Sequence, residues 1–496
     1  MFIRDVSILM KGKKMRKLEN LKPERVFYWF EEICRIPHGS GNTRAISDFI
    51  ADFGHEHGLR VYQDEMNNVV LYKNGTSGYE NSAPVILQGH MDMVCEKTPD
   101  SDHDFLNDPL DLYIEDGFVR AHGTTLGGDD GIYVAMALAI LEDDSLAHPP
   151  IEAVFTVDEE IGLLGAEGLD TSVLSGRRMI NLDSEADGIL WVASAGGVST
   201  RSSIPVKWTD SKGFSAEITI DGLVGGHSGA EIDKNRASAV MLMGRLMFEL
   251  ENVCDYGLVS LYGGEKENAI PRNSRAEILM SEDASEAVTA ACEKLKAELR
   301  QEYAGTDENI DIRVTVSGEK EAAVLHPTSQ SKVIFFLRNV PWGIRKMSGT
   351  VKDLVETSNN AGIIRLNEQE FTAECGVRSS VGSAKKDLAG HIRHLTEFLG
   401  GECTFSGDYP AWEYRADSPL RDVFVSVFKR VNGHEPVVTA VHAGLECGLF
   451  YGKMPSLDCV SLGPDIIDIH TTSEHLDIAS TERTYNLLCE VLKELK

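Results

Sequence analysis

Two adjacent glutamates, Glu159 and Glu160, follow the apolar run 151–157 and precede Gly162. Paired carboxylates raise each other's pKa and resist burial, so such a pair is costly unless a cation or a proton transfer uses it. One glutamate could hold a metal ion while its neighbour moves protons. The alternative is an ordinary strand end that opens into a solvated acidic turn, and the pair alone does not decide between the two.

Further histidine and carboxylate side chains stand beside apolar runs. Ligands of open α/β sheets bind beyond the carboxyl ends of the strands, so residues that follow strands are expected to meet at one edge of a sheet. Taken singly, Asp129 could be a helix N-cap, Asp183 and Glu185 could form a solvated turn, and His470 could be a surface histidine. The full set is His90 and Asp92 after 83–88, Asp129 before the apolar helix 132–141, Glu159 and Glu160 after 151–157, Asp183 after 178–182, and His470 after 457–462.

Together these side chains predict a site for two metal ions. Imidazole and carboxylate ligands favour zinc and also suit manganese or cobalt. Two ions about 3.5–4 Å apart need a bridging carboxylate and terminal ligands on both sides. Asp92 is placed to orient the His90 imidazole, and Glu159 is left as general base for a metal-bound water. The ligands available are His90, Asp129, Glu160, Asp183 and His470.

The helices and strands that must position these residues follow one order at the two ends of the chain and another in the middle. Up to residue 196 and again from 408, apolar strands alternate with helices at 43–57, 132–141 and 481–496, which predicts an α/β catalytic domain with a mixed, mostly parallel sheet. In between, strands follow one another closely, which predicts a smaller α+β domain with antiparallel pairing. We therefore expect a catalytic domain formed by 1–196 and 408–496, interrupted by a second domain over 197–407. Residues 1–14 are expected to be a disordered extension, and 96–119 a polar surface excursion.

Composition excludes several classes of protein. The 496 residues carry 48 basic and 78 acidic side chains, a net charge of −30 that argues against nucleic acid or an anionic membrane as a partner. No apolar run approaches the roughly 18 residues of a transmembrane helix. The nine cysteines are odd in number and form no CxxC pair, which indicates reduced thiols in a cytoplasmic protein.

Six longer motifs occur in order along the chain: GHMDMV at 89–94, TTLGGDDGI at 124–132, FTVDEEIGLLGA at 155–166, INLDSE at 180–185, GGHSGAEI at 225–232 and HAGLECGLF at 442–450. They resemble the motifs of the M20 metallopeptidases, most closely the aminoacyl-histidine dipeptidase branch. The resemblance runs from about Leu18 to the C-terminus. It implies a catalytic α/β domain interrupted by an α+β lid, and a homodimer formed through that lid.

The resemblance also implies a role for each metal-site residue. It makes His90 and Asp183 ligands of one metal, Glu160 and His470 ligands of the other, and Asp129 the bridge between them. Asp92 resembles the supporting aspartate, and Glu159 the general base. One departure is Asp130, which stands where this branch more usually has asparagine, so Asp129 and Asp130 could be exchanged as ligand.

The same resemblance names substrate-binding candidates in both domains. His227 resembles the histidine that polarises the scissile carbonyl, and Arg378 the arginine that binds the substrate carboxylate. The alternatives are that 225–229 is only a tight turn and that Arg378 is a surface residue at a strand end. His442 and Glu446 are expected to line the site, and Asn360 is a weaker candidate.

The implied reaction is hydrolysis of dipeptides, including Xaa-His and other unspecific dipeptides, by a metal-bridging water that Glu159 activates. The residues 465–472 differ from the commoner proline-containing form of this loop, which leaves substrate preference open. A related aminopeptidase, tripeptidase or N-acyl amino acid deacylase is the close alternative. A non-catalytic interaction module that keeps the fold is the alternative of another class.

Overall fold

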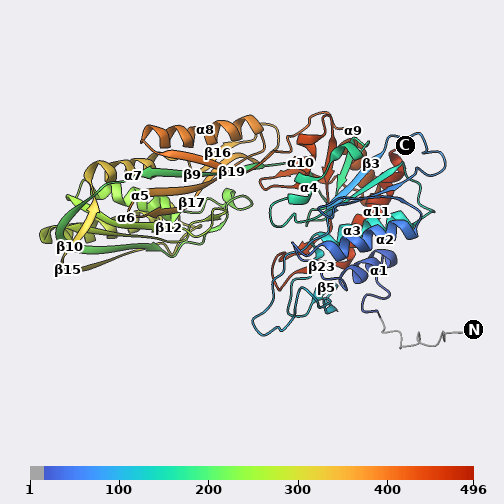
Figure 1. The fold of residues 1–496 in the computed structure, drawn as a ribbon, viewed down its shortest axis with the longest axis horizontal. Helices are drawn as coiled ribbons and strands as arrows, with labels where there is room; N and C mark the ends of the chain where they lie inside the picture. The colour runs from blue at the N-terminus through green and yellow to red at the C-terminus, as the bar shows by residue number, and fades with distance from the viewer. Residues whose placement is uncertain (1–15) are drawn as a thin grey trace, which may run out of the picture. The chain divides into compact units, whose positions relative to one another are not determined.

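The computed structural model describes residues 16–496, and its internal contacts divide the chain into two compact units. Unit 1 comprises the chain up to Val192 together with Arg415–Thr439 and Leu445–Lys496. Unit 2 comprises Ala193–Tyr414 and Ala440–Gly444. The extension expected at 1–14 lies outside the described residues. Figure 1 shows the elements of both units.

Unit 1 is built on an eight-stranded sheet in the order β1-β2-β6-β3-β7-β21-β8-β20. The central strands β6, β3, β7 and β21 run parallel, whereas β1, β2 and β8 pair antiparallel with their neighbours. Strands β3, β6 and β21 are buried along their length, as parallel strands between helices require. The mixed, mostly parallel sheet expected from the sequence is thereby confirmed. The bounds are β1 Arg60–Gln63, β2 Val69–Lys73, β3 Val85–His90, β6 Ile151–Thr156, β7 Arg178–Asn181, β8 Ile189–Ser194, β20 Val437–Val441 and β21 Asp458–Ser461.

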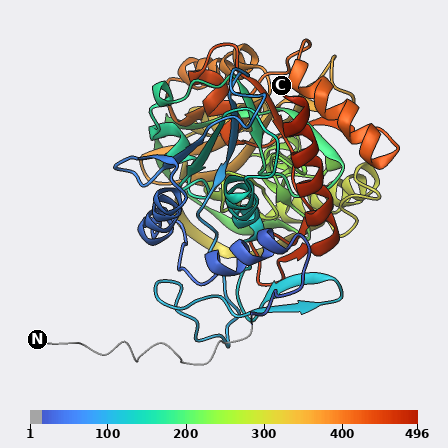
Figure 2. The ribbon, with the colours of Figure 1, turned by 90° about the vertical axis from the view of Figure 1, so that its right-hand side faces the viewer.

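Helices of unit 1 pack around this sheet, and α3 is the most deeply buried of them. Every residue from Gly128 to Leu141 is buried, which explains why the sequence of α3 is apolar on all sides. One core joins α3 to residues of α1, α2, α9 and α11. Figure 2 shows the ribbons of α1 and α2 in blue and that of α11 in red. The bounds are α1 Glu24–Ile33, α2 Arg44–Glu56, α3 Gly128–Glu142, α4 Leu164–Gly168, α9 Pro419–Asn432, α10 Glu446–Lys453 and α11 Ile478–Glu494.

A small four-stranded sheet in unit 1 was not foreseen. Its order is β22-β23-β5-β4, with β4 Leu112–Glu115, β5 Phe118–Ala121, β22 Ile466–Ile467 and β23 His475–Asp477. The excursion expected over 96–119 thus includes a hairpin that pairs with the C-terminal part of the chain. Local patterning could not reveal it, because β5 finds its partner in a segment that is remote in sequence. This sheet holds both ends of the loop that carries His470.

Unit 2 contains a nine-stranded antiparallel sheet in the order β15-β10-β14-β12-β17-β18-β9-β19, with β16 added at β17. The α+β fold with antiparallel strands expected for the middle of the chain is confirmed. A short pair, β11 Gly226–His227 and β13 Ala269–Ile270, lies outside this sheet. The strands of the large sheet are β9 Gly196–Pro205, β10 Trp208–Asp221, β12 Tyr256–Gly263, β14 Ser274–Met280, β15 Asp311–Leu325, β16 Gly343–Met347, β17 Val355–Leu366, β18 Glu370–Ser379 and β19 Glu402–Tyr409.

Four α-helices of unit 2 share a second core with this sheet. They are α5 Ala239–Leu250, α6 Ser285–Glu302, α7 Pro327–Asn339 and α8 Gly382–Phe398. The two units therefore have separate hydrophobic cores.

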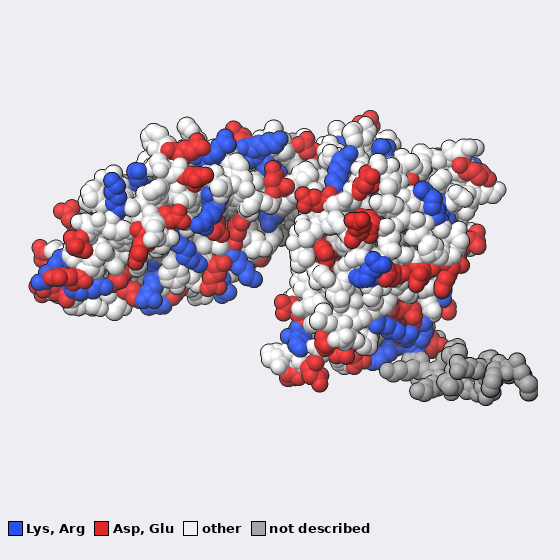
Figure 3. Space-filling view, viewed as in Figure 1, with Lys and Arg blue, Asp and Glu red and all other residues white. Residues whose placement is uncertain are grey.

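Acidic and basic side chains are interspersed over the face drawn in Figure 3. This face has no broad basic surface that could bind a polyanion, which agrees with the net charge of −30. Across residues 16–496, no helix is both long enough and apolar enough to cross a membrane.

Candidate metal centre

The carboxyl ends of the four parallel strands of unit 1 carry the residues singled out in the sequence. His90 is the last residue of β3, Asp183 follows β7, and the pair Glu159 and Glu160 follows β6. The chain turns away after the glutamate pair at Gly162, whose φ of 126° suits glycine. His470 lies in the loop after β21, and its own φ of 61° marks a tight turn there. Parallel pairing brings these ends to one edge, as the sequence predicts.

Asp129 lies between two imidazoles, with one carboxylate oxygen toward each. Its Oδ1 is 3.2 Å from Nε2 of His90, and its Oδ2 is 3.2 Å from Nε2 of His470. His90 Nε2 is also 3.8 Å from Oδ1 of Asp183, and His470 Nε2 is 2.9 Å from Oε1 of Glu160. The structure thus brings together all five residues expected to bind metal, with Asp129 in the middle.

Ligand atoms of these residues form overlapping groups in which all atoms lie within 4.8 Å of one another. Such spacing of nitrogen and carboxylate oxygen donors fits divalent metal ions. Three members go beyond the expected ligand set, namely Asp130, Glu185 and the expected base Glu159. The groups are His90, Asp130 and Asp183; His90, Glu159 and Glu160; Asp129, Glu160 and His470; and Asp129, Asp183 and Glu185.

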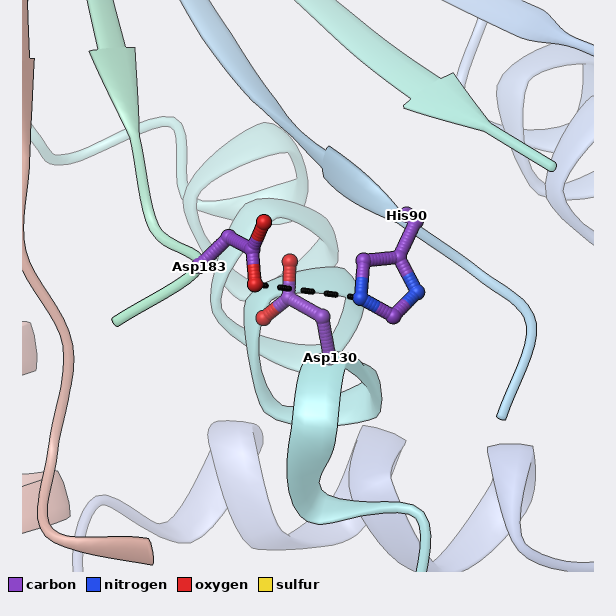
Figure 4. Close-up of side chains that lie close together, drawn as sticks. All are labelled: His90, Asp130 and Asp183. Carbon is purple, nitrogen blue, oxygen red and sulfur yellow. Dashed lines mark ion pairs between the residues drawn. The ribbon is translucent and has the colours of Figure 1, made fainter. Parts of the chain in front are cut away.

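Asp130 reaches the same place as the expected ligands. Figure 4 shows its carboxylate directed toward Asp183 and His90 from the start of α3. Asp130 is 1% exposed, and within residues 16–496 its Oδ2 has no hydrogen-bond partner. Burial, with Asp183 adding to it, raises the pKa of Asp130 well above its usual value. The departure from asparagine noted in the sequence therefore adds a carboxyl group at the centre itself.

Charged groups within the centre shift one another's pKa. Burial alone would lower the pKa of His90, but its contacts with Asp129 and Asp92 raise it well above the usual value. Hydrogen bonds to Asp129 and Glu160 raise the pKa of His470 to about 10. Burial raises the pKa of Asp183 well above its ordinary range. Carboxylates this close together repel one another, and their charge raises the pKa of the neighbouring histidines. Bound cations would offset that repulsion, so this set of donor atoms fits a metal site.

Asp92 links His90 to the glutamate pair. Its Oδ1 is 3.5 Å from Nδ1 of His90, and it accepts hydrogen bonds from Ser40 Oγ at 2.8 Å and from the backbone N–H of Glu159 at 3.2 Å. Glu159 itself is half-buried, and desolvation raises its pKa well above the usual value, with Asp183 and Glu446 adding to the effect. A carboxyl group with a raised pKa suits a general base that works near neutral pH.

Unit 2 contains a second polar cluster, formed by His227, Arg378 and His442. A Cβ built on Gly229 would lie 2.7 Å from the carbonyl oxygen of His442, 3.0 Å from Cε1 of His227 and 3.2 Å from Nε of Arg378. Only glycine leaves room for this convergence. Burial and the Arg378 charge lower the pKa of His227, and the same causes lower that of His442 to about 3.

The three side chains of this cluster are held in defined orientations. The Nδ1 of His227 accepts from the backbone N–H of Ala230 at 3.0 Å, so the neutral ring carries its proton on Nε2. His442 Nε2 lies 2.7 Å from Ser358 Oγ, and Arg378 donates to the Tyr409 hydroxyl at 2.9 Å. The cluster therefore offers a charged guanidinium and a neutral imidazole donor.

Arg378 also lines a cavity of about 260 Å³ within unit 2. The walls include Ser228, Glu267 and Tyr409. Among the described residues, the buried Oγ of Ser228 has no hydrogen-bond partner. A guanidinium beside a buried hydroxyl suits a small carboxylate ligand.

Two of the residues expected to contact the substrate form hydrogen bonds with other parts of the protein. Glu446 is fully buried in unit 1 and accepts hydrogen bonds from Gln88 and from Thr156 Oγ. Asn360 donates to the backbone carbonyls of Glu267 at 2.7 Å and Ala269 at 2.8 Å. Their side chains support neighbouring segments in the structure as it stands.

Sequence reasoning missed two carboxylates of unit 1. Glu185 was considered only as part of a possible solvated turn, yet it belongs to one of the ligand groups. Glu474 was not considered, although it is 4% exposed and four residues beyond His470. A weak signal for Glu474 was its place in the same polar loop as His470, but its partners are remote in sequence.

Comparisons with known proteins agree on one family. The sequence pattern of peptidase family M20/M25/M40 matches residues 86–494. The cytosol non-specific dipeptidase of Escherichia coli (strain K12) is 34% identical over 483 residues, which are 97% of this chain and 99% of that protein. The crystal structure of the aminoacylhistidine dipeptidase from Vibrio alginolyticus has a TM-score of 0.89 at 34% identity, covering 96% of this chain and 98% of the other. Aminopeptidase PepT from Bacillus cereus ATCC 10987 shares the fold, with a TM-score of 0.54 at 15% identity over 96% of this chain and 99% of the other.

Proposed function

Because the chain belongs to peptidase family M20/M25/M40, we propose that it is a metal-dependent dipeptidase. The observation that carries this proposal is the position of Asp129, whose two carboxylate oxygens face His90 and His470 at 3.2 Å each. A carboxylate shared in this way suits a bridge between two cations. The two named relatives that are 34% identical to this chain are a non-specific dipeptidase and an aminoacylhistidine dipeptidase, and each matches nearly the whole chain.

The proposed centre holds two divalent ions. His90 and Asp183 would hold one, Glu160 and His470 the other, and Asp129 both. Zn²⁺ suits this mixture of imidazole and carboxylate best, with Mn²⁺ or Co²⁺ as alternatives. When bound, such ions supply Lewis-acid polarisation of a carbonyl oxygen and make a water more acidic.

Glu159 performs the proton transfers in this proposal. It takes a proton from the attacking water and delivers it to the amine that leaves when the peptide bond breaks. Its raised pKa allows it to hold that proton between the two steps. Asp92 positions both partners of this chemistry, since it contacts the His90 ring and accepts from the Glu159 backbone.

We assign substrate recognition in unit 2 to Arg378 and His227. The Arg378 guanidinium would bind the carboxylate of the peptide, and the protonated Nε2 of His227 would donate to the scissile carbonyl. Glu446 and His442 act as supports in this scheme, because each is buried and hydrogen-bonded. The α+β segment over 197–407 would serve as lid and as the interface of a homodimer.

The proposed substrates are dipeptides with a free amino group, Xaa-His among them, in the cytoplasm. The Glu185 carboxylate stands beside Asp129 and Asp183 in one of the ligand groups. A carboxylate there would attract the ammonium group of an unblocked peptide and not an N-acyl amino acid. This favours dipeptide hydrolysis over the deacylase alternative.

The test combines metal analysis with a substrate panel. Purified protein is analysed for metal by mass spectrometry and assayed with Xaa-His dipeptides, other dipeptides, tripeptides and N-acyl amino acids, before and after chelation. We expect about two metal ions per chain, turnover of dipeptides, loss of that turnover on chelation, and recovery with Zn²⁺. Protein that stays metal-free and inactive in excess Zn²⁺ would favour the non-catalytic interaction module instead.

A further inference from the structure

Glu474 connects the loop of His470 to the turn that presents Asp129. Its Oε2 accepts from the backbone N–H groups of Leu126 at 2.8 Å and Gly127 at 3.1 Å. Its Oε1 accepts from the backbone N–H of Gly128 at 2.8 Å. The carboxylate therefore receives backbone hydrogen bonds from three consecutive residues, and the N–H of the next residue, Asp129, is a fourth donor at 3.5 Å from Oε1.

These N–H groups belong to the turn that leads into α3, where backbone donors lack partners inside the helix. Gly127 has a left-handed φ of 68°, and a Cβ on Gly128 would lie 3.2 Å from Oε1 of Glu474. The two glycines thus let the backbone wrap closely around the carboxylate. A buried carboxyl group that accepts several N–H bonds holds such a turn in place.

The other end of this connection is the loop between β22 and β23. The backbone N–H of Glu474 donates to the carbonyl of Thr471 at 3.1 Å, so the residue closes a tight turn directly after His470. One side chain thereby sets the separation between the segment carrying Asp129 and the segment carrying His470. The 3.2 Å approach of His470 Nε2 to Asp129 Oδ2 depends on that separation.

We infer that Glu474 is a positioning residue for the metal centre. Its side chain holds the shared carboxylate of Asp129 at the distance from His470 that a metal ion requires. This inference rests on the proposed function of the centre as a metal site. Residues that orient metal ligands without touching the metal change affinity by about 10–100-fold when they are altered.

Glu152 provides a matched control in the same unit. It is a buried carboxylate, 5% exposed, that accepts from the Ser175 backbone N–H at 3.0 Å, the Ser175 hydroxyl at 2.6 Å and the Gly176 backbone N–H at 3.0 Å. It stands near the start of β6, at the opposite end of the strand from the glutamate pair. Glu152→Gln removes a comparable set of contacts and leaves every proposed ligand in place.

The experiment compares the affinity for Zn²⁺ of metal-free unaltered protein, Glu474→Gln and Glu152→Gln, by competition with a chromophoric chelator. Thermal unfolding of the metal-free proteins is measured alongside. Glutamine keeps one acceptor oxygen but turns an NH₂ group toward backbone donors. We expect Glu474→Gln to weaken Zn²⁺ binding by about 10–100-fold and Glu152→Gln to change it less than about twofold, with similar losses of thermal stability.

A Glu474→Gln protein that binds Zn²⁺ no more weakly than Glu152→Gln would overturn the inference. If Glu474→Gln does not fold, Gly128→Ala perturbs the same contact from the other side and is held to the same comparison. Failure of the proposed function is recognised separately, because the unaltered protein would then bind no Zn²⁺ in the same titration, and the inference would fall with it.

Discussion

The two units gather polar side chains of opposite character. In unit 1, carboxylates crowd around His90 and His470 and raise the pKa of both imidazoles. In unit 2, burial and the neighbouring Arg378 lower the pKa of His227 and His442. The protein thus favours the protonated form of histidine in unit 1 and the neutral form in unit 2.

This contrast suits the two clusters to different ligands. The unit 1 cluster has surplus negative charge, which suits cations, whereas the unit 2 cluster has one guanidinium and neutral donors, which suit a carboxylate. A peptide carries both a polarisable carbonyl and a carboxylate terminus. The proposed reaction therefore needs both kinds of cluster, and altering each should give a different kinetic signature.

Removal of the proposed base should have the largest effect. We expect Glu159→Gln to lower kcat by about 10²–10⁴-fold while bound metal is retained, because proton transfer is lost but the ligands remain. Turnover and metal content per chain are measured together, and Glu160→Gln is the matched control, expected to lose metal. A Glu159→Gln protein without metal would instead make Glu159 the ligand of the pair.

Substitution of Arg378 in unit 2 should weaken binding of the substrate carboxylate. Arg378→Lys keeps a positive charge but loses the planar fork of donors, so we expect kcat/KM for dipeptides to fall by about 10–100-fold, mainly through KM. Arg365→Lys is the control, since Arg365 donates to backbone carbonyls of Gly263 and Gly264 within the same unit. Peptide amides, which lack the carboxylate, should show no difference between the unaltered protein and Arg378→Lys. An equal loss for acids and amides would remove Arg378 from carboxylate binding.

The smallest expected effect is on how the free energy of unfolding changes with pH. The folded pKa of His442 is about 3 against an ordinary value of 6.5, so the unfolded chain binds a proton that the folded chain excludes between these pH values. The free energy of unfolding should therefore fall as pH is lowered through this window, with His442 contributing at most about 1.4 kcal/mol per pH unit. Denaturant unfolding at pH 7, 6 and 5 measures the slope. His442→Gln should flatten it, and an unchanged slope would show that His442 is not the group responsible.

Much of the organisation could be predicted from the sequence. The apolar runs that became β3, β6, β7 and β21 were recognisable, and the resemblance to the M20 metallopeptidases is confirmed by the family match over 86–494. The hairpin β4–β5 was missed because its partner β23 is remote in sequence, and so was Glu474, whose acceptor role depends on N–H groups of the Gly127 turn. Pairings of this kind have no local pattern by which they could be recognised.

The sequence by itself determined which residues could carry chemistry, since residue types and their places after apolar strands are properties of the chain. It also determined the family and the alternation of α/β and α+β segments. Only the tertiary structure decided how Asp129 divides its two oxygens between His90 and His470, and that Asp130 and Glu185 join the centre. The reason is physical: parallel pairing assigns strands to one edge of a sheet, but distances within that edge depend on packing among segments that are hundreds of residues apart.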